Sequence, residues 1–393
     1  MCQQYDFSDI APFEDSVFSA KMAFLVNEPG FEHAVRYVMP QVDYPAFKET
    51  LLSIPNKDQF QSKIMFPFLE MLAQRTTSGI TCSGLENISQ DKVYTFVTNH
   101  RDIVLDASFL NLCFLRNGFP TSEVGIGNNL LIYEWITDLV KLNRSFIVKR
   151  NLRMSKALEA AKELSSYIHY AITQKHRSVW IAQREGRAKD SNDLTQEGVI
   201  KMLGLCGGDD FAGNIEALNI VPVSISYEYD PNDYLKAREF LLKRLNPDFK
   251  KSPHDDLLSM ETGLLQPKGR IHFAIGKCIN DQLSEELNGV DRHEAVKRVC
   301  KLLDCTIHEG YRLYPVNYMA SDLLHNSTQH ASEYTPEQLE EFRIYLSQQL
   351  DKVVIEGSEI SALDRKYMTE MMLTMYSNPL KNKKDSARKC ESI

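Results

Sequence analysis

Short runs of β-branched and aromatic residues alternate along this chain with longer segments of helical periodicity. The short runs predict buried strands at residues 93–98, 145–148, 179–182, 219–225 and 271–275. Apolar residues three or four positions apart predict helices between them, the most regular at residues 154–173. Strands that alternate with helices are typical of an α/β domain. The sequence therefore predicts a central mixed, mostly parallel sheet flanked by helices over residues 81–280.

Helical periodicity dominates both ends of the chain. Residues 1–80 hold four such stretches separated by proline-containing turns and predict an N-terminal helical bundle. Residues 281–377 predict a C-terminal helical extension. The polar, turn-rich residues 228–269 are interpreted as an insertion into the α/β domain. The lysine-rich residues 378–393 predict a disordered basic tail.

The composition is that of an ordinary globular protein. The 393 residues are 43% hydrophobic and 25% charged, which is enough to build a large core. The formal net charge of −8 argues against a general nucleic-acid binder. No apolar run approaches the ~20 residues of a membrane span, and the first residues lack the features of a signal peptide. Eight scattered cysteines without a Cys-x-x-Cys pair indicate reduced thiols, and we expect a cytoplasmic protein.

The most informative segment follows the first predicted strand of the sheet. His100 comes directly after that strand, and Asp102 and Asp106 come shortly behind it. Open α/β sheets place their ligands at the carboxyl ends of strands. A histidine held by a carboxylate can take a proton from a hydroxyl. The simpler interpretation, a helix cap or a surface pair, fits these residues as well when they are taken alone.

Three further segments bear on that choice. Residues 145–150 end in Lys149 and Arg150, residues 179–187 run into a Glu-Gly-Arg turn, and residues 219–225 contain a Val-Pro pair. In this order and spacing, the four segments resemble the sequence blocks of the glycerolipid acyltransferases. That family includes the glycerol-3-phosphate and 1-acylglycerol-3-phosphate acyltransferases. The resemblance covers about residues 80–280 and is that of a divergent member.

The spacing within the segments departs from the family pattern. Five residues separate His100 from Asp106, where the family usually has four, and one residue separates His100 from Asp102. Gly186 and Arg187 are adjacent, where the family usually has one residue between them. Asp102 is the better placed helix N-cap, so it is expected to satisfy backbone N–H groups. We therefore predict that Asp106, one helical turn further on, orients the histidine ring.

The resemblance implies an acyltransferase of phospholipid biosynthesis. It would transfer an acyl chain from acyl-CoA or acyl carrier protein (acyl-ACP) to a hydroxyl of glycerol-3-phosphate or a lysophospholipid. The predicted catalytic residues are His100, Asp106 and Asp102. The residues predicted to bind the phosphate-bearing acceptor are Arg150, Arg184, Glu185, Gly186 and Arg187. No metal is implied, and no cofactor beyond the thioester co-substrate.

The partners follow from the same resemblance and from the charge pattern. Acyl carrier protein is acidic and would suit the basic residues around the second segment. Arg153 and Lys156 in that region are interpreted as a solvated helix face. Peripheral contact with the inner surface of a membrane is expected, with the basic tail adding attraction to anionic lipid. His272, inside the last predicted strand, is assigned to the core rather than to catalysis.

Other functions stay open at this point. The acceptor could be a different lipid, such as an aminoacyl lipid, or the protein could bind lipids without catalysis. A serine hydrolase is disfavoured because Ser83 lacks the leading glycine of a Gly-x-Ser-x-Gly turn. A metal enzyme built on His100, Asp102 and Asp106 is disfavoured because no second cluster of ligands accompanies them.

Overall fold

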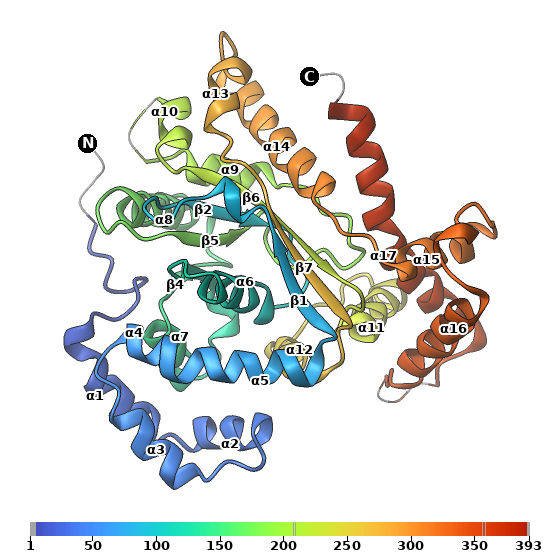
Figure 1. Ribbon diagram of the computed structural model, residues 1–393, viewed down its shortest axis with the longest axis horizontal. Coiled ribbons are helices and arrows are strands. Elements are labelled where there is room, and N and C mark those ends of the chain that lie inside the picture. The colour runs from blue at the N-terminus through green and yellow to red at the C-terminus, as the bar shows by residue number, and fades with distance from the viewer. Residues whose placement is uncertain (1–4, 207, 209, 356, 358, 391–393) are drawn as a thin grey trace.

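The computed structural model describes residues 5–206, 208, 210–355, 357 and 359–390. Seven strands form one sheet in the order β1-β7-β6-β2-β5-β3-β4 (Figure 1). The strands are β1 (Gly79–Ser83), β2 (Thr95–Thr98), β3 (Glu123–Gly127), β4 (Ser145–Val148), β5 (Val179–Ala182), β6 (Ile220–Tyr227) and β7 (Arg270–Ile275). Residues 1–4 and 391–393, which hold the ends of the predicted N-terminal region and basic tail, lie outside the described part.

Five neighbouring strands, from β6 to β4, run parallel to one another. Strand β7 pairs antiparallel with β6, and β1 pairs parallel with β7. The prediction of a mixed, mostly parallel sheet is therefore confirmed. Its centre is β2, whose Thr98 lies opposite Ala182 of β5 and Val223 of β6. The register aligns the carboxyl ends of β2 and β5, so the loops that follow these two strands leave the same edge, while β6 continues to Tyr227.

Helices cover both faces of the sheet, and the side chains of β2 show why. Successive residues of a strand point to opposite faces. Val97 packs into a core with α8 (Met154–Thr173), α9 (Glu197–Leu203) and α14 (Arg292–Glu309). Its neighbour Phe96 packs into a second core with α5 (Phe66–Thr76) and α6 (Leu105–Arg116). Both faces of β2 are therefore apolar, as is typical of the central strands of α/β proteins.

The N-terminal helices pack together with one helix of the α/β region. Phe18, Phe31 and Phe60 share a buried cluster with Leu142 of α7 (Glu134–Leu142). Proline at the first or second position begins two of these helices, where its missing N–H costs nothing. The N-terminal elements are α1 (Asp15–Leu25), α2 (Pro29–Val38), α3 (Tyr44–Leu52), α4 (Lys57–Phe60) and the π-helix η1 (Gln61–Met65), which runs into α5.

The remaining helices lie between strands or after the sheet. Residues 228–269, predicted as an insertion, join the antiparallel neighbours β6 and β7 and contain α11 (Asp233–Leu245) and α12 (Pro253–Leu265). No helix in the described part of the chain is long and apolar enough to cross a membrane. The other elements are α10 (Phe211–Glu216), α13 (Asn280–Glu286), α15 (Pro315–His325), α16 (Pro336–Asp351), α17 (Ala362–Cys390), η2 (Leu85–Asn87), η3 (Asn128–Leu130) and η4 (Ala331–Glu333).

The prediction of a disordered basic tail is wrong for residues 378–390. These residues continue α17, the red helix at the right of Figure 1, which lies against α11, α14 and α15. Leu380, Asn382 and Ser386 are buried, so this part of the helix has a packed face. Lys383 donates from Nζ to the carbonyl oxygens of residues 309 and 311. Lys381, Lys383 and Lys384 therefore belong to the polar face of an amphipathic helix.

The cysteines differ from their predicted state at two positions. Cys206 and Cys305 each take part in a disulfide bond, so the prediction of uniformly reduced thiols is wrong there. Four other cysteines, Cys82, Cys113, Cys278 and Cys300, are free. The scattered spacing in the sequence carries no sign of these bonds, because disulfide partners come together only in the fold.

Candidate active site

The sequence-predicted site residues gather at the carboxyl edge of the sheet. His100 follows β2 by two residues, and Gln183 follows β5 directly. A backbone bond from Gln183 N to Thr98 O (2.8 Å) ties the start of the second loop to the end of β2. Asn99 is fully buried and bonds through its amide to both the N–H and the C=O of Ile225 in β6. These bonds fix the point at which the chain leaves the sheet and so the position of His100.

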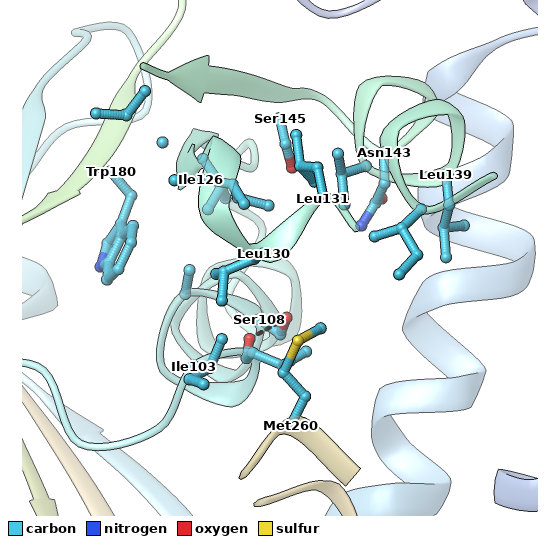
Figure 2. A pocket seen from close by; sticks show the side chains of 18 of the residues that line it. Ile103, Ser108, Ile126, Leu130, Leu131, Leu139, Asn143, Ser145, Trp180 and Met260 are labelled. Carbon is cyan, nitrogen blue, oxygen red and sulfur yellow. Dashed lines mark hydrogen bonds between the residues drawn. The ribbon is translucent and has the colours of Figure 1, made fainter. Parts of the chain in front are cut away.

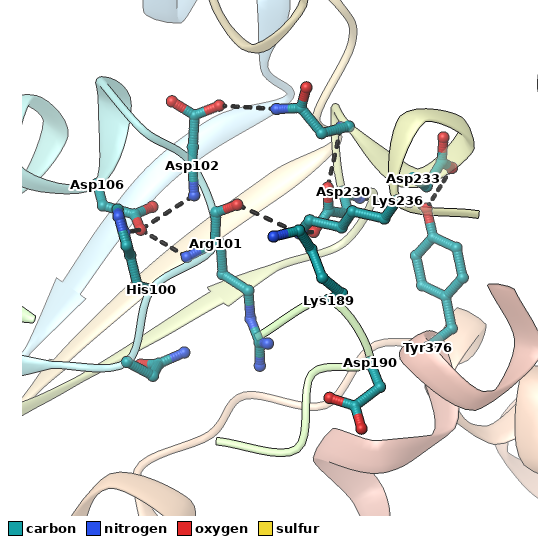
Figure 3. A network of polar contacts seen from close by, with 12 residues as sticks. His100, Arg101, Asp102, Asp106, Lys189, Asp190, Asp230, Asp233, Lys236 and Tyr376 are labelled. Carbon is teal, nitrogen blue, oxygen red and sulfur yellow. Dashed lines mark hydrogen bonds and ion pairs between the residues drawn. The ribbon is translucent and has the colours of Figure 1, made fainter. Parts of the chain in front are cut away.

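The His100 ring is bound by Asp106 and not by Asp102. The distance from His100 Nδ1 to Asp106 Oδ2 is 2.8 Å (Figure 3). The same oxygen accepts the backbone N–H groups of Arg101 at 2.6 Å and Asp102 at 3.0 Å. The Asp106 side chain is fully buried, whereas that of His100 is 13% exposed. Among the described residues none bonds to His100 Nε2, so that nitrogen is the one left to meet a substrate.

Asp102 holds the turn that leads into α6. Its Oδ1 accepts the N–H groups of Val104 at 2.9 Å and Leu105 at 2.7 Å. Its Oδ2 accepts a bond from the Asn232 side chain, and a Cβ added at Gly263 would come within 2.0 Å of it. Burial, followed by the charge of Asp106, raises the pKa of Asp102 above its usual value. Asp102 is therefore placed to shape the loop, and it does not touch the ring.

The Glu-Gly-Arg turn begins directly after β5. Gly186 has φ of +67°, a conformation that favours glycine. The N–H of Glu185 donates to Gln196 Oε1 at 2.7 Å, which anchors the turn to the segment before α9. Arg187 is 6% exposed, yet its Nη1 has no hydrogen-bond partner among the described residues, and the same holds for Nε of Arg184. Buried donors without partners are rare in proteins and mark a place for an acceptor.

Arg150 reaches the same region from the end of β4. Its backbone N–H donates to Asn128 Oδ1 at 2.8 Å, and its Nε lies 3.9 Å from Glu185 Oε1. Burial lowers the pKa of Arg150, and the nearby carboxylates of Glu185 and Asp256 oppose that effect. A Cβ added at Gly127 would come within 2.9 Å of the guanidinium carbon. Glycine at residue 127 therefore gives Arg150 its room.

One cavity joins these groups to a large apolar space. It has a volume of about 1800 Å³ and is lined by His100, the predicted acceptor-binding residues Arg150, Arg184, Glu185, Gly186 and Arg187, and many apolar side chains. Apolar side chains from several separate elements point into it, among them Ile103, Leu130, Leu139 and Met260 (Figure 2). Asp102 and Asp106 lie behind His100 and do not line it. The cavity is therefore lined by a histidine, by cations and by apolar side chains.

Several contacts that hold the His100 loop were not apparent from the sequence. Arg101 Nη2 lies 2.6 Å from Asp193 Oδ2, which joins the His100 loop to the segment after the Glu-Gly-Arg turn. Lys236, in α11, pairs with Asp230 and donates to Arg101 O at 3.3 Å. The indole of Trp180 packs edge-on against the His100 ring, with 5.7 Å between centroids. These partners lie about 80 to 135 positions from the His100 loop, so no local pattern announces them.

Metal ligation finds no support in the part of the chain that the structure covers. No group of three or more His, Cys, Asp or Glu side chains there is placed to hold an ion. Both oxygens of Asp102 and Oδ2 of Asp106 accept bonds from backbone N–H groups, from Asn232 and from the His100 ring. The His-Asp pair is therefore available for proton transfer.

His272 lies in β7, as predicted, and does not line the cavity. Its Nδ1 is 2.8 Å from Thr81 Oγ1, and its Nε2 is 3.0 Å from Ser83 Oγ. Burial, followed by the charges of Arg312 and Lys383, lowers the pKa of His272 to about 4. The neutral ring thus belongs to the packing of the sheet edge.

This lowered pKa makes stability depend on pH. Below a pH of about 6.5, the ordinary pKa of histidine, residue 272 takes up a proton in the unfolded chain. In the folded protein His272 stays neutral down to a pH of about 4. The free energy of unfolding should therefore fall as the pH drops from 7 to 5. Between pH 7 and pH 5, we expect the free energy of unfolding of His272→Gln to fall by about 1 kcal/mol less than that of the wild type. Urea unfolding at both pH values would measure the difference. The exposed His33→Gln is the control, and an unchanged pH dependence in His272→Gln would contradict the assignment.

Comparison with known proteins adds one structural similarity. No family model and no curated protein matches the sequence. Among solved structures, the chain is similar to the 1-acyl-sn-glycerophosphate (LPA) acyltransferase PlsC from Thermotoga maritima, at 13% sequence identity and a TM-score of 0.36. The match covers 74% of this chain and 92% of that chain. Similarity at this level carries no conclusion about function, which has to come from the side chains of the site.

Proposed function

We propose that this protein is an acyltransferase that moves an acyl chain from an acyl thioester to a hydroxyl of a phosphate-bearing glycerolipid. The observation that carries the proposal is that one cavity is lined by a carboxylate-held histidine, by guanidinium side chains and by apolar residues. An amphipathic substrate with a phosphate, a hydroxyl and a hydrocarbon chain would satisfy all three features. The sequence segments that resemble the glycerolipid acyltransferases supply the histidine and the cations.

The proposed reaction uses the free nitrogen of His100. Nε2 takes the proton of the acceptor hydroxyl as that oxygen attacks the thioester carbonyl carbon. The new C–O bond forms, the C–S bond then breaks, and the departing thiolate receives the proton from the imidazolium. Asp106 would keep Nδ1 protonated and offset the positive charge of the ring. The thioester is the co-substrate, and the reaction needs no acyl-enzyme and no further cofactor.

The acceptor phosphate is assigned to the cations. Guanidinium groups suit phosphate because they present several N–H donors in a fixed plane. Arg187 and Arg184 have donors to spare, and Arg150 enters the same cavity from β4. We therefore propose glycerol-3-phosphate or a lysophospholipid as acceptor, with acyl-CoA or acyl carrier protein as donor. The apolar walls, which Figure 2 shows around Leu130 and Met260, would take a hydrocarbon chain.

An acyl-transfer assay tests the proposal directly. The purified protein would be incubated with a radiolabelled acyl donor, as coenzyme A or carrier-protein thioester, and with a panel of acceptors separated by chromatography. We expect label in the acylated form of a phosphate-bearing glycerolipid. Label released only as free fatty acid would indicate a hydrolase. Bound but unreacted lipid would indicate a non-catalytic lipid-binding protein, and label in an aminoacyl lipid would change the acceptor.

Removing a cation should affect the acceptor more than the donor. We expect Arg187→Ala to raise the acceptor KM by about 10- to 100-fold, because charge-assisted bonds to the phosphate are lost. The donor KM should stay within a factor of about two. Steady-state kinetics with each substrate varied in turn would show the difference. Arg116→Ala, in α6 but outside the cavity lining, is the matched control. A change in the donor constant alone would assign Arg187 to the acyl carrier.

A further inference from the structure

The first turns of α8 have no packed face. All nine residues from 151 to 159, here named the α8 tip, are exposed, whereas the same helix buries Leu164, Ile168 and Ile172 further on. Met154 is 91% exposed, Leu158 is 55% exposed and Leu152 is 36% exposed. A surface helix normally turns its apolar side chains toward the core. Three large apolar side chains that project from one short segment therefore indicate a partner outside this chain.

The charges of the α8 tip indicate an anionic partner. Arg153 and Lys156 lie within it, Lys162 follows it by one turn, and Glu159 is the one acidic residue among residues 151–159. No described carboxylate lies within ion-pair distance of any of these three cations. Met154, Leu158 and Lys162 follow one another at intervals of four positions, so they share a face of the helix, and Lys156 lies on the opposite face. This arrangement of apolar and basic side chains is that of a helix that binds at a membrane surface.

The α8 tip also forms part of the cavity wall. Leu152 and Ala157 belong to the tip and line the cavity, and Arg150 lines it from the residue before. A lipid that left a bilayer at this point would reach the apolar space without crossing water. Leu152 is both exposed and part of the lining, so the cavity wall and the protein surface meet at this residue.

We propose that the α8 tip is a docking surface for an anionic phospholipid bilayer, in which Met154 and Leu158 insert and the surrounding cations contact lipid phosphates. The choice of a lipid surface rests on the proposed function of the cavity. An acidic carrier protein would match the cations but would not account for the exposure of Met154, the most exposed apolar side chain. The sequence predicted that the lysine-rich C-terminal residues would contact the membrane. Those residues pack against the protein as part of α17, so the α8 tip replaces them as the proposed membrane contact.

Vesicle binding by the full chain tests this proposal in the absence of any substrate. Vesicles of phosphatidylcholine, with and without phosphatidylglycerol, would be sedimented with the wild type and with the double variant Met154→Asp, Leu158→Asp. We expect stronger binding when phosphatidylglycerol is present, and a loss of about tenfold or more in the double variant. The matched control is Val354→Asp, Leu363→Asp, whose side chains are 69% and 73% exposed in the C-terminal region.

Each outcome of the vesicle-binding experiment supports or overturns the proposed docking surface. Because the substituted side chains are exposed, both double variants should keep the melting temperature of the wild type and its activity on glycerol-3-phosphate. Equal loss of vesicle binding in both double variants, or no binding by the wild type, overturns the proposal. Retained vesicle binding with lost affinity for an acyl carrier protein would reassign the α8 tip to a protein partner. An inactive wild type that still binds vesicles through Met154 and Leu158 would refute the proposed function and leave the docking surface standing.

Discussion

Replacing His100 with alanine should lower kcat for acyl transfer by about 10² to 10⁴, the range that a general base contributes. The reason is that Nε2 is the one ring nitrogen free to accept the hydroxyl proton, since Nδ1 is held by Asp106. The acceptor KM should change little, because the phosphate contacts are assigned to arginines. Initial rates at saturating donor and acceptor would measure the loss.

His272→Gln provides the control for this variant. It removes a histidine from the same sheet but outside the cavity lining, so its activity at neutral pH should match the wild type. A His100→Ala enzyme that keeps more than about a tenth of the wild-type rate would show that His100 is not the base. Circular dichroism of both variants would confirm that the fold is kept.

Asp106→Asn should lower kcat by about 10² or more with little change in melting temperature. The asparagine oxygen can still accept the N–H groups that Asp106 Oδ2 accepts now, from the His100 ring and from residues 101 and 102. The negative charge is lost, however, so the imidazolium that forms during the reaction is no longer offset. Paired measurements of kcat and thermal unfolding would separate the two effects.

Asp102→Asn is the matched control, because Asp102 is equally buried and lies four residues before Asp106, in the turn that leads into α6. Its Oδ1 caps Val104 and Leu105, and an asparagine oxygen can do the same. A milder kinetic effect is therefore expected than for Asp106→Asn. An inactive Asp102 variant beside an active Asp106 variant would reverse the roles of the two carboxylates.

The sequence predicted the elements whose signal is local. Strands β4, β5, β6 and β7 are runs of apolar residues, and α8 begins and ends where its periodicity predicts. Strands β1 and β3 were not predicted, because Gly79–Ser83 is polar at the sheet edge and Glu123–Gly127 contains two glycines. A strand of this kind is stabilised by its neighbours rather than by its own residue preferences.

The candidate site divides in the same way. His100 and Asp106 lie six positions apart, so a turn between strand and helix could be reasoned from the sequence. The sequence left open which carboxylate contacts the His100 ring, because one residue more than usual separates His100 from Asp106. The fold accommodates this residue in the turn that Asp102 caps. The pair of Arg101 and Asp193 needed the fold itself, because its partners come from loops after two different strands.

The last helix, α17, contacts the region around the site, so these contacts can form only after this helix has been synthesised. Three side chains of α17 reach the site region: Tyr376 donates to Asp233 at 2.8 Å, Asn378 to Asp190 O at 2.7 Å and Asn382 to Ser191 O at 3.4 Å. The bonds to residues 190 and 191 restrain the segment that follows the Glu-Gly-Arg turn. During synthesis, every strand of the sheet emerges from the ribosome before residues 376–382 exist. The contacts that restrain the segment after the Glu-Gly-Arg turn therefore form only after all the residues of the sheet have been made.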